Sequence, residues 1–375
     1  MNVCIVGPAY PYRGGIAHFT SLLAREFAKD HHVDIINYQR LYPSFLFPGR
    51  TQYDESNSPL RVESERIIDS INPLSWRRAA ARIAELRPDL VVVKWWQPFF
   101  APALRSITSA VQHRTGSPVV FLCHNVLPHE SSIVDRVLAR HGLGHADAYL
   151  LQSSEDEQKL QSILPGSRTG FNPHPMYDWF NMGHYSRDRA RESLGVSGRV
   201  LLFFGLIRPY KGVDVLLRAF ARVAEELDAT LLIVGEFYED RAPYETLISE
   251  LNIGDRVRIV DRYVPNEEVE KYFKASDLAV LPYRSATQSG IVQTAFSFEM
   301  PVIVTRVGGL PDVVIDGKTG YIVPPDDPSA LAAAIRRFFD EGAAGRMSAG
   351  IREDAERFSW RHCVEALIRL GDRTR

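Results

Sequence analysis

The stretch LLFFGLIRPYKGVDVLLRAF, residues 201–220, decides the fold because a strand, a turn and a helix follow one another within it. The apolar run over residues 200–204 is long enough for a buried parallel strand. Gly205 ends this run, and from residue 213 to 220 the apolar side chains are spaced like the inner face of a helix. This order is typical of a βα unit in a parallel sheet.

Two cations lie in the turn between this strand and helix. Arg208 and Lys211 are three positions apart, and Gly212 leads into the helix. Cationic side chains together with the free N–H groups of a helix N-terminus attract a phosphate or diphosphate. The alternative is a surface turn whose Arg and Lys are only solvated, because exposed cations are common in turns. The turn is our first candidate phosphate site.

Length and composition predict a globular protein of two domains. The chain has 375 residues, which is too long for a single ordinary hydrophobic core. Of these residues 45% are hydrophobic and 24% charged, as is typical of a globular protein. The formal net charge of −2 gives no reason to expect nucleic acid as a partner. Three cysteines far apart, Cys4, Cys123 and Cys363, indicate reduced thiols rather than a disulfide framework. Neither C-x-x-C nor H-E-x-x-H spacing occurs, so we expect no metal site.

The sequence predicts a cytoplasmic protein. The N-terminus has no basic region, and its apolar run is too short for a signal peptide. No stretch approaches the about 18 apolar residues of a spanning helix. A peripheral association with the inner face of the membrane stays open, because a lipid-borne substrate needs no spanning helix.

The first half of the chain begins like a doubly wound sheet. A strand over residues 2–6 is followed by a loop with Gly14 and Gly15, then a helix, and a second strand over 32–37. Residues 38–73 read as a long irregular insertion, and such loops often shape binding sites. The dinucleotide fingerprint G-x-G-x-x-G is absent, which disfavours a dehydrogenase.

Polar and aromatic side chains follow two further strands, at residues 90–93 and 119–123. Ligands of open α/β sheets collect at the carboxyl ends of the strands, and a neutral histidine can hold a substrate hydroxyl. Packing under the next loop is the alternative for the tryptophans, and a hydrogen bond to the backbone is the alternative for the histidine. The candidates at these strand ends are Lys94, Trp95, Trp96, His124 and Asn125.

The second half repeats the βα alternation after a connection over residues 168–187. Strands at 230–234 and 257–260 are followed by Gly235, Glu236, Asp261, Arg262 and Tyr263. Further on, the polar loop of ATQSGIVQTAFSF, residues 286–298, opens a helix expected at about 289–298. That helix start is a second candidate anion site. Its alternative is simple N-capping by Thr287 or Ser289.

These residues resemble a known family. The strings FGLIRPYKGVDVLLRAF (204–220), ATQSGIVQTAFSF and PVIVTRVGGLPDVVIDGKTGYIVPPDDPSALAAAI (301–335) are similar to family 4 of the retaining, nucleotide-sugar-dependent glycosyltransferases. The ATQSG form resembles a bacterial sub-branch. The match is strong over 200–335 and weaker before it, where it rests on the Gly14–Gly15 loop, the His124–Asn125 pair and the strand order.

The resemblance implies the GT-B architecture, with two facing Rossmann-like α/β domains whose parallel sheets are flanked by helices. An N-terminal acceptor-binding domain would span 1–185, and a C-terminal nucleotide-sugar-binding domain would span 186–357. A C-terminal helix within 358–375 would pack back on the first domain. The donor would be a UDP or GDP sugar, and the acceptor a saccharide or a polyprenol-linked saccharide in the assembly of bacterial surface polysaccharide.

The resemblance also implies roles for the candidate residues. Arg208, Lys211 and His124 would be catalytic, the two cations on the donor diphosphate and His124 beside the donor sugar. Gly235, Glu236 and Asp261, Arg262, Tyr263 would lie near the nucleobase, and Lys94, Trp95, Trp96 and Asn125 near the acceptor. The donor-binding set would be Gly14, Gly15, Gly205, Thr287, Gln288, Ser289, Gly290, Ile291 and Gln293.

The sequence departs from the family pattern at two places. Most members carry two glutamates eight positions apart in the region 287–295, where this chain has Thr287 or Gln288 near the first and Gln293 or Thr294 near the second. The arginine that usually follows the glycine of the turn is also absent. Leu206 stands there, so Arg208 would have to supply that charge.

We expect transfer without a metal or another cofactor, because no D-x-D acidic pair stands at a pocket position. The resemblance implies that the reaction also uses no protein nucleophile. Arg208, Lys211 and the helix dipole would stabilise the leaving group electrostatically. A nucleotide-sugar epimerase would want carboxylates at the sugar, and a phosphorylase would need a lysine-bound pyridoxal phosphate. The alternative from another functional class is a non-catalytic subunit that binds nucleotide sugar. Turnover by the isolated chain would exclude this alternative.

Overall fold

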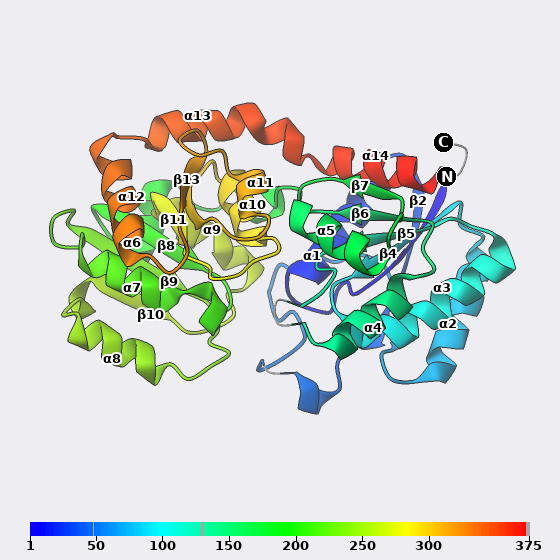
Figure 1. The fold of residues 1–375 in the computed structure, drawn as a ribbon. Helices are drawn as coiled ribbons and strands as arrows, with labels where there is room; N and C mark the ends of the chain where they lie inside the picture. The colour runs from blue at the N-terminus through cyan, green and yellow to red at the C-terminus, as the bar shows by residue number, and fades with distance from the viewer. Residues whose placement is uncertain (48, 129–130, 373–375) are drawn as a thin grey trace. The chain divides into compact units, whose positions relative to one another are not determined.

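The computed structural model describes residues 1–47, 49–128 and 131–372 as two compact units (Figure 1). Unit 1 comprises Met1–Glu55, Pro59–His174 and the C-terminal segment from Ser359 on, and unit 2 comprises Ser56–Ser58 and Pro175–Phe358. The main division therefore falls between His174 and Pro175, eleven residues before the expected position at 185. The last three residues of the expected C-terminal segment, 373–375, lie outside the described residues.

Unit 1 is built on a seven-stranded parallel sheet in the order β3-β2-β1-β4-β5-β6-β7. The strand order reverses direction between β1 and β4, which is where open α/β sheets bind ligands. The strands are β1 (Asn2–Val6), β2 (His32–Arg40), β3 (Glu65–Asp69), β4 (Leu90–Trp95), β5 (Val119–Cys123), β6 (Ala148–Leu151) and β7 (Thr169–Phe171). The helices are α1 (Gly15–Phe27), α2 (Pro73–Leu86), α3 (Ala101–Thr115), α4 (Ile133–Leu143), α5 (Ser154–Ile163) and α14 (Trp360–Gly371), with 3₁₀ turns η1 (Ser44–Leu46) and η2 (Pro98–Phe100).

Unit 2 repeats this plan with six parallel strands in the order β10-β9-β8-β11-β12-β13, and its order reverses between β8 and β11. The strands are β8 (Arg199–Phe204), β9 (Ala229–Val234), β10 (Val257–Val260), β11 (Leu278–Leu281), β12 (Val302–Thr305) and β13 (Gly320–Val323). The α-helices are α6 (Arg187–Leu194), α7 (Val213–Ala221), α8 (Ala242–Glu250), α9 (Asn266–Ala275), α10 (Gly290–Ser297), α11 (Leu310–Val313), α12 (Pro328–Asp340) and α13 (Ala344–Asp354). The 3₁₀ turns are η3 (Asp178–Phe180), η4 (Pro209–Lys211), η5 (Gly254–Arg256) and η6 (Ala355–Phe358).

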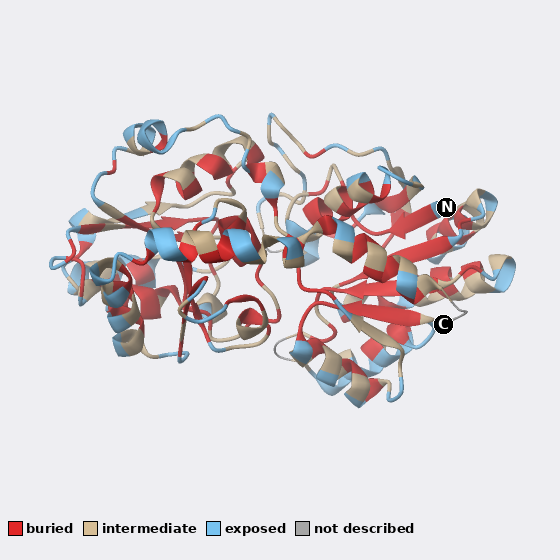
Figure 2. Ribbon diagram, turned by 90° about the horizontal axis from the view of Figure 1, so that it is seen from above, coloured by how far each residue is buried: buried red, intermediate tan, exposed pale blue. Residues whose placement is uncertain are grey.

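The core of each unit lies around its central strands. Strands β4, β5 and β11 are buried along their whole length, as expected of apolar strands covered on both faces. Figure 2 shows these sheets in red between helices whose outer faces are pale blue. The final helix α14 packs against α1 and β6 of unit 1, and Ser359 caps its N-terminus by accepting a hydrogen bond from the His362 amide (3.3 Å).

The structure differs from the sequence-based expectation in three segments. Residues 38–73 are not a wholly irregular insertion, because β2 continues to Arg40 and the segment contains β3. The expected connection over 168–187 contains β7 as the last strand of the first sheet. Lys94 and Trp95 lie inside β4 rather than after it. Both missed strands are short, and β3 is an edge strand with charged residues at its ends, so neither has a strong apolar pattern.

Candidate functional site

The cationic turn of unit 2 is held in place by Arg284, which follows β11. The Arg284 amide donates to the carbonyl of Tyr210 (2.7 Å), and its guanidinium donates to the carbonyl of Pro209 (2.8 Å). The same guanidinium donates to both oxygens of Asp214 in α7 (2.8 and 2.7 Å) and to Asp326 (2.6 Å). Arg284 therefore ties the turn, the helix and the strand end together. Sequence reasoning missed this residue, and its only signal was a cation just after a buried strand.

Two glycines allow the strand ends to approach one another closely. Gly212 has φ +67°, and a Cβ there would lie 2.1 Å from the carbonyl oxygen of Pro282. Gly235, after β9, has φ +151°, and its Cβ would lie 1.8 Å from the carbonyl oxygen of Gly205. Only glycine fits where the φ angle is positive and a backbone oxygen is this close. Gly235 was assigned to the nucleobase region, and the structure shows a backbone requirement at that position.

Lys211 points its ammonium group at aromatic rings rather than at a carboxylate. Its Nζ lies 3.6 Å from the ring centroid of Tyr283 and 5.1 Å from that of Tyr210. Burial, with the nearby charge of Arg208 as a smaller cause, lowers the pKa of Lys211 to about 7. The Arg208 guanidinium lies 4.8 Å from the ring centroid of Tyr238. Neither cation has a carboxylate partner within the described part of the chain, and such cations favour an incoming anion.

The second candidate anion site, the start of α10, lies next to this turn. The ring of Tyr283 contacts Lys211 on one side, and its hydroxyl lies 3.4 Å from the Ser289 hydroxyl. The side chain of Ile291 would come within 3.5 Å of a Cβ at Gly205. The strand ends of β8 and β11 thus bring together two segments about 80 positions apart, as parallel strands at a switch point do.

No side chain caps α10, so the N-capping alternative is not seen at Ser289. Thr287 is buried, and its hydroxyl oxygen has no hydrogen-bond partner among the described residues. The same is true of both side-chain polar atoms of Gln293. Buried polar atoms are rarely left without partners, and these two side chains occupy the region where the family that the sequence resembles carries glutamates. The helix itself begins at Gly290 and ends at Ser297.

The residues assigned to the nucleobase lie at the same edge of the second sheet. Glu236 is buried directly after β9, and its carbonyl accepts a hydrogen bond from the Ile207 amide (3.0 Å). Asp261 accepts from the Phe237 amide (3.1 Å). Arg262 donates to Glu268 (2.5 Å), and Tyr263 is half-buried beside it. Gln288 is half-buried in the loop before α10. The candidate residues of unit 2 therefore gather at one edge of the sheet.

The glycine loop of unit 1 leads directly into α1. Gly14 has φ +95° and precedes the first residue of the helix, Gly15, and no side chain caps this N-terminus. Behind the loop lies Asn37 of β2, fully buried, which accepts from the Ala9 amide (3.2 Å) and donates to the Tyr10 carbonyl (3.0 Å). Asn37 fixes the loop from within the sheet. Sequence reasoning missed it because a lone asparagine in a strand has no distinctive pattern.

His124 is buried at the carboxyl end of β5, against the ring of Phe19. The two ring centroids are 4.7 Å apart, and the planes are nearly perpendicular at 82°. His174 meets the same phenyl ring from another direction, at 4.8 Å. Burial lowers the pKa of His124 well below its ordinary value, the charges of Lys94 and His174 lower it further, and a hydrogen bond with Gln152 opposes them. The imidazole is therefore neutral, and its Nε2 has no partner among the described residues.

Lys94 also lies against Phe19, on the face of the ring. Its Nζ is 3.6 Å from the ring centroid, the side chain is fully buried, and no hydrogen-bond partner is found for Nζ among the described residues. A Cβ at Gly7 would come within 2.4 Å of the Lys94 side chain. Burial lowers the pKa of Lys94 well below its ordinary value of 10.5. The structure thus places a buried amine with a lowered pKa beside a neutral imidazole.

The other residues assigned to the acceptor differ in how far they are buried. Trp95 is fully buried, and its indole N–H donates to the Val126 carbonyl (3.2 Å). Trp96 is half-buried, donates to the Tyr42 hydroxyl (3.0 Å), and packs on Phe100 with centroids 4.3 Å apart. Trp95 therefore fits the alternative in which the tryptophan is a packing residue. Trp96 and the half-buried Asn125 are the ones that retain some exposed surface.

Replacing Lys94 with methionine should raise the stability of the protein by about 1 kcal/mol or more. Because the folded-state pKa is depressed below 10.5, the unfolded chain binds more protons than the folded chain at this position. The lysine therefore opposes folding, more strongly as the pH falls. The increase in Tm should be larger at about pH 6 than at about pH 9, as measured by thermal unfolding at both.

The matched control is Lys318→Met, because Lys318 is an exposed lysine paired with Glu353 (2.9 Å). It should leave Tm nearly unchanged, as expected for a surface ion pair. A Lys94→Met variant that is less stable than the parent at both pH values would show that the amine is charged and paired in the folded protein.

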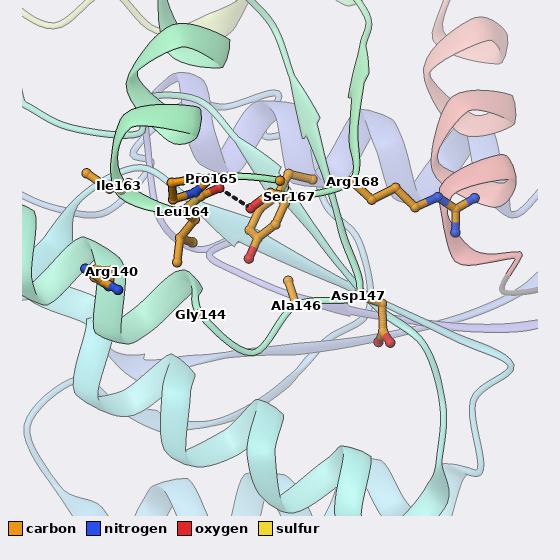
Figure 3. A pocket seen from close by; sticks show the side chains of 11 residues that line it. Arg140, Gly144, Ala146, Asp147, Ile163, Leu164, Pro165, Ser167 and Arg168 are labelled. Atoms are coloured by element: carbon orange, nitrogen blue, oxygen red, sulfur yellow. Dashed lines mark hydrogen bonds between the residues drawn. The ribbon is translucent and has the colours of Figure 1, made fainter.

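One open pocket lies away from these residues (Figure 3). Its cavity of about 490 Å³ is lined by Arg140, Tyr149, Leu164, Ser167 and Arg168, among others. It lies at the turns that precede β6 and β7, at the amino edge of the first sheet. Figure 3 shows the Arg168 side chain extending toward α14, where it donates to the carbonyls of Arg369 and Asp372. This pocket is therefore separate from the candidate site.

Among residues 1–47, 49–128 and 131–372, no group of three or more His, Cys, Asp or Glu side chains is placed to hold a metal ion. In the same residues, no helix combines the length and the apolar character needed to cross a bilayer.

Two family models match the chain, one in each half. Residues 13–169 match the model described as Glycosyltransferase Family 4, and residues 198–341 match Glycosyl transferases group 1. The D-inositol 3-phosphate glycosyltransferase 1 of Catenulispora acidiphila is 33% identical over 236 residues, 60% of this chain and 56% of that protein. The D-inositol 3-phosphate glycosyltransferase of Mycolicibacterium smegmatis is 31% identical over 229 residues, 60% of this chain and 52% of that protein. The chain thus matches about half the length of these curated relatives.

Solved structures match the chain over nearly its whole length. Sucrose-phosphate synthase from Thermosynechococcus elongatus has a TM-score of 0.76 at 20% identity, covering 99% of this chain and 98% of that one. Anabaena HepE in complex with UDP has a TM-score of 0.75 at 17% identity, covering 98% and 99%. The predicted fold, two parallel-sheet α/β domains with flanking helices, is confirmed.

Proposed function

Because the chain pairs a family 4 glycosyltransferase domain with a group 1 glycosyltransferase domain, we propose that it transfers a sugar from a nucleotide-diphosphate sugar to an acceptor hydroxyl. The observation that carries the proposal is the cationic turn of unit 2, where Arg208 and Lys211 face rings and have no carboxylate partner among the described residues. A UDP or GDP sugar is the proposed donor, in line with a structural neighbour solved with UDP. A saccharide or a lipid-linked saccharide is the proposed acceptor.

The proposed reaction retains the configuration of the sugar. The bond between the anomeric carbon and the diphosphate oxygen breaks while the acceptor oxygen forms a bond on the same face, and the hydroxyl proton passes to the departing phosphate oxygen. Arg208, Lys211 and the amides at the start of α10 would stabilise the charge that develops on the diphosphate. Since these groups come from the protein itself, we propose that transfer needs no metal ion.

In unit 1, the neutral imidazole of His124 is the proposed contact for a hydroxyl of the donor sugar. A neutral histidine both accepts and donates hydrogen bonds, and its Nε2 is without a partner among the described residues. Asn125, the next residue, and Trp96, which comes directly after β4 at the same sheet edge, are the proposed acceptor contacts.

A thermal-shift panel tests the donor class. UDP, GDP, ADP, NAD and UDP-sugars are added separately, each with and without EDTA, because a ligand that binds only the folded state raises its stability. A rise in Tm with one nucleoside diphosphate, unchanged by EDTA, is the expected result. No rise with any diphosphate, or a rise with NAD alone, would contradict the assignment. Binding of a nucleotide sugar without turnover by the isolated chain would identify a non-catalytic subunit.

Affinity for the donor should decrease as the pH rises above 7. Because the pKa of Lys211 in the free protein is about 7, the amine must take up a proton above that pH to pair with the diphosphate. The affinity should then fall by up to about tenfold per pH unit. Calorimetric titration with a nucleotide sugar between about pH 6 and pH 9 measures this dependence. A Lys211→Arg variant should bind with little pH dependence, since arginine stays protonated. An equally steep pH dependence in that variant would exclude Lys211 as its source.

A further inference from the structure

The exposed large hydrophobic side chains are unevenly distributed over the described residues. Unit 2 contributes Ile315 alone. Most of the others come from three segments of unit 1 that follow the carboxyl ends of β2, β3 and β5, and in a parallel sheet these ends share one edge. They are Phe45, Leu46, Tyr53, Ile71, Leu74, Ile133, Val134 and Val137. Single exposed apolar residues are ordinary, but a concentration at one edge marks an interaction surface.

The first turns of α4 carry the most exposed aliphatic residues of this group. Ile133 is 81% exposed, Val134 65% and Val137 63%. They stand on a fixed helix start, because Ser132 accepts a hydrogen bond from the Asp135 amide (3.1 Å) while Asp135 accepts one from the Ser132 amide (2.9 Å). This reciprocal capping box holds the helix terminus in place. The exposure of these side chains therefore belongs to a formed helix.

The opposite side of α4 is packed tightly on the sheet. Ala139, Gly142 and Leu143 are buried, and a Cβ at Gly142 would come within 2.7 Å of the ring of Trp95. Helix α4 lies beside α3 on the outside of unit 1 (Figure 1). The helix is thus fixed to unit 1 by one side and presents its aliphatic residues on the other.

The exposed side of α4 is basic as well as apolar. Arg136 and Arg140 are exposed on the same helix, and neither forms an ion pair within the described part of the chain. The one acidic residue of the helix, Asp135, is engaged in the capping box. Aliphatic residues next to arginines are typical of helices that lie in the interface of a membrane with anionic lipids.

We propose that the α4 face, consisting of Ile133, Val134, Arg136, Val137 and Arg140, docks unit 1 onto an anionic lipid bilayer. The aliphatic side chains enter the boundary between headgroups and acyl chains, and the two arginines contact anionic headgroups. A second copy of the chain fits this face less well. Around a two-fold axis the same patch meets itself, which would bring the unpaired Arg136 and Arg140 toward their own copies.

The position of this face matters for the acceptor. Helix α4 begins nine residues after His124, at the same edge of the first sheet. A bilayer at this edge would present a lipid-linked saccharide to Asn125 and Trp96. This last consequence rests on the proposed function, whereas docking to the bilayer is independent of it.

Co-sedimentation of the full chain with lipid vesicles tests the proposal. Vesicles of phosphatidylcholine alone are compared with vesicles containing about 30% phosphatidylglycerol, at low and at high salt. We expect binding to the anionic vesicles that weakens with salt. The double variant Ile133→Ser/Val137→Ser should bind at least about tenfold more weakly. Arg136→Gln/Arg140→Gln should lose about tenfold in its preference for anionic vesicles. The control Ile315→Ser, on unit 2, should bind like the parent.

The outcomes that overturn the proposal are distinct. These are failure of the parent chain to bind either vesicle, or equal binding by the parent and both double variants. A parent dimer that Ile133→Ser/Val137→Ser converts to monomer would assign the face to a second copy instead. The side chains substituted on α4 are already exposed, so Tm should be unchanged in the two double variants, and thermal unfolding checks this. The nucleotide thermal shift should persist in every variant, which separates failure of the membrane proposal from failure of the proposed donor site.

Discussion

Replacing Lys211 with alanine should slow sugar transfer by about 100-fold to 1000-fold, the usual effect of removing one group that stabilises developing charge. The ammonium lies 3.6 Å from the ring centroid of Tyr283 and the side chain is half-buried, so water screens its attraction for a diphosphate only in part. The measurement is the initial rate of transfer at saturating donor, near pH 7. The assignment of Lys211 to the leaving diphosphate fails if the variant turns over at the parent rate.

The same variant should fold normally. Burial lowers the pKa of Lys211 from 10.5 to about 7, so between these values the unfolded chain binds more protons and the lysine opposes folding. Its removal should leave Tm unchanged or higher, and a large fall in Tm would mean that lost activity reflects lost structure. Lys318→Ala is the matched control in the same unit, because this exposed lysine is paired with Glu353 at the surface (2.9 Å). It should retain the parent rate.

Gly212→Ala should destabilise the protein by about 3 kcal/mol or more. Two costs add at this position. The backbone has φ +67°, and the new Cβ would lie 2.1 Å from the carbonyl oxygen of Pro282, so the turn must move away from the end of β11. Since the turn carries Arg208 and Lys211, donor binding should weaken as well. Chemical denaturation and calorimetry with the nucleotide sugar measure the two effects.

Two glycine controls separate these costs. Gly317 has φ +75° with nothing within 4 Å of its Cβ position, so Gly317→Ala should cost only the backbone strain, about 1 kcal/mol. Gly254 has no positive φ and also faces open space, so Gly254→Ala should be close to neutral. If Gly212→Ala destabilises the protein no more than Gly317→Ala does, the turn can move away from Pro282 at little cost.

Much of the fold could be predicted from the sequence because parallel strands have a local signature. The predicted strands at 2–6, 119–123 and 257–260 match β1, β5 and β10, since each is a short run bounded by polar or turn residues. Strands β3 and β7 were missed because their pairing to a neighbour, rather than their own composition, makes them strands. Helices α3 and α4 lie in segments for which no helix was predicted.

The candidate site was predicted in part. Arg208, Lys211 and the start of α10 were singled out because cations and polar residues directly follow apolar runs, and the structure brings them together at one sheet edge through Tyr283. Arg284 was missed, because its role depends on Asp214, 70 positions away. The roles of Trp95 and Trp96 could not be separated from sequence, because one is fully buried and the other is not.

By itself the sequence determined the class of the fold and the location of the cationic turn, because the periodicity of apolar residues and the cations after a strand are local properties of the chain. Only the tertiary structure decided that Lys94 is a buried amine with no hydrogen-bond partner among the described residues, that Arg284 holds the turn, and that α4 presents its aliphatic residues outward. The physical reason is that burial, pKa and hydrogen-bond partners depend on segments far apart in sequence, which come together only when the sheets form.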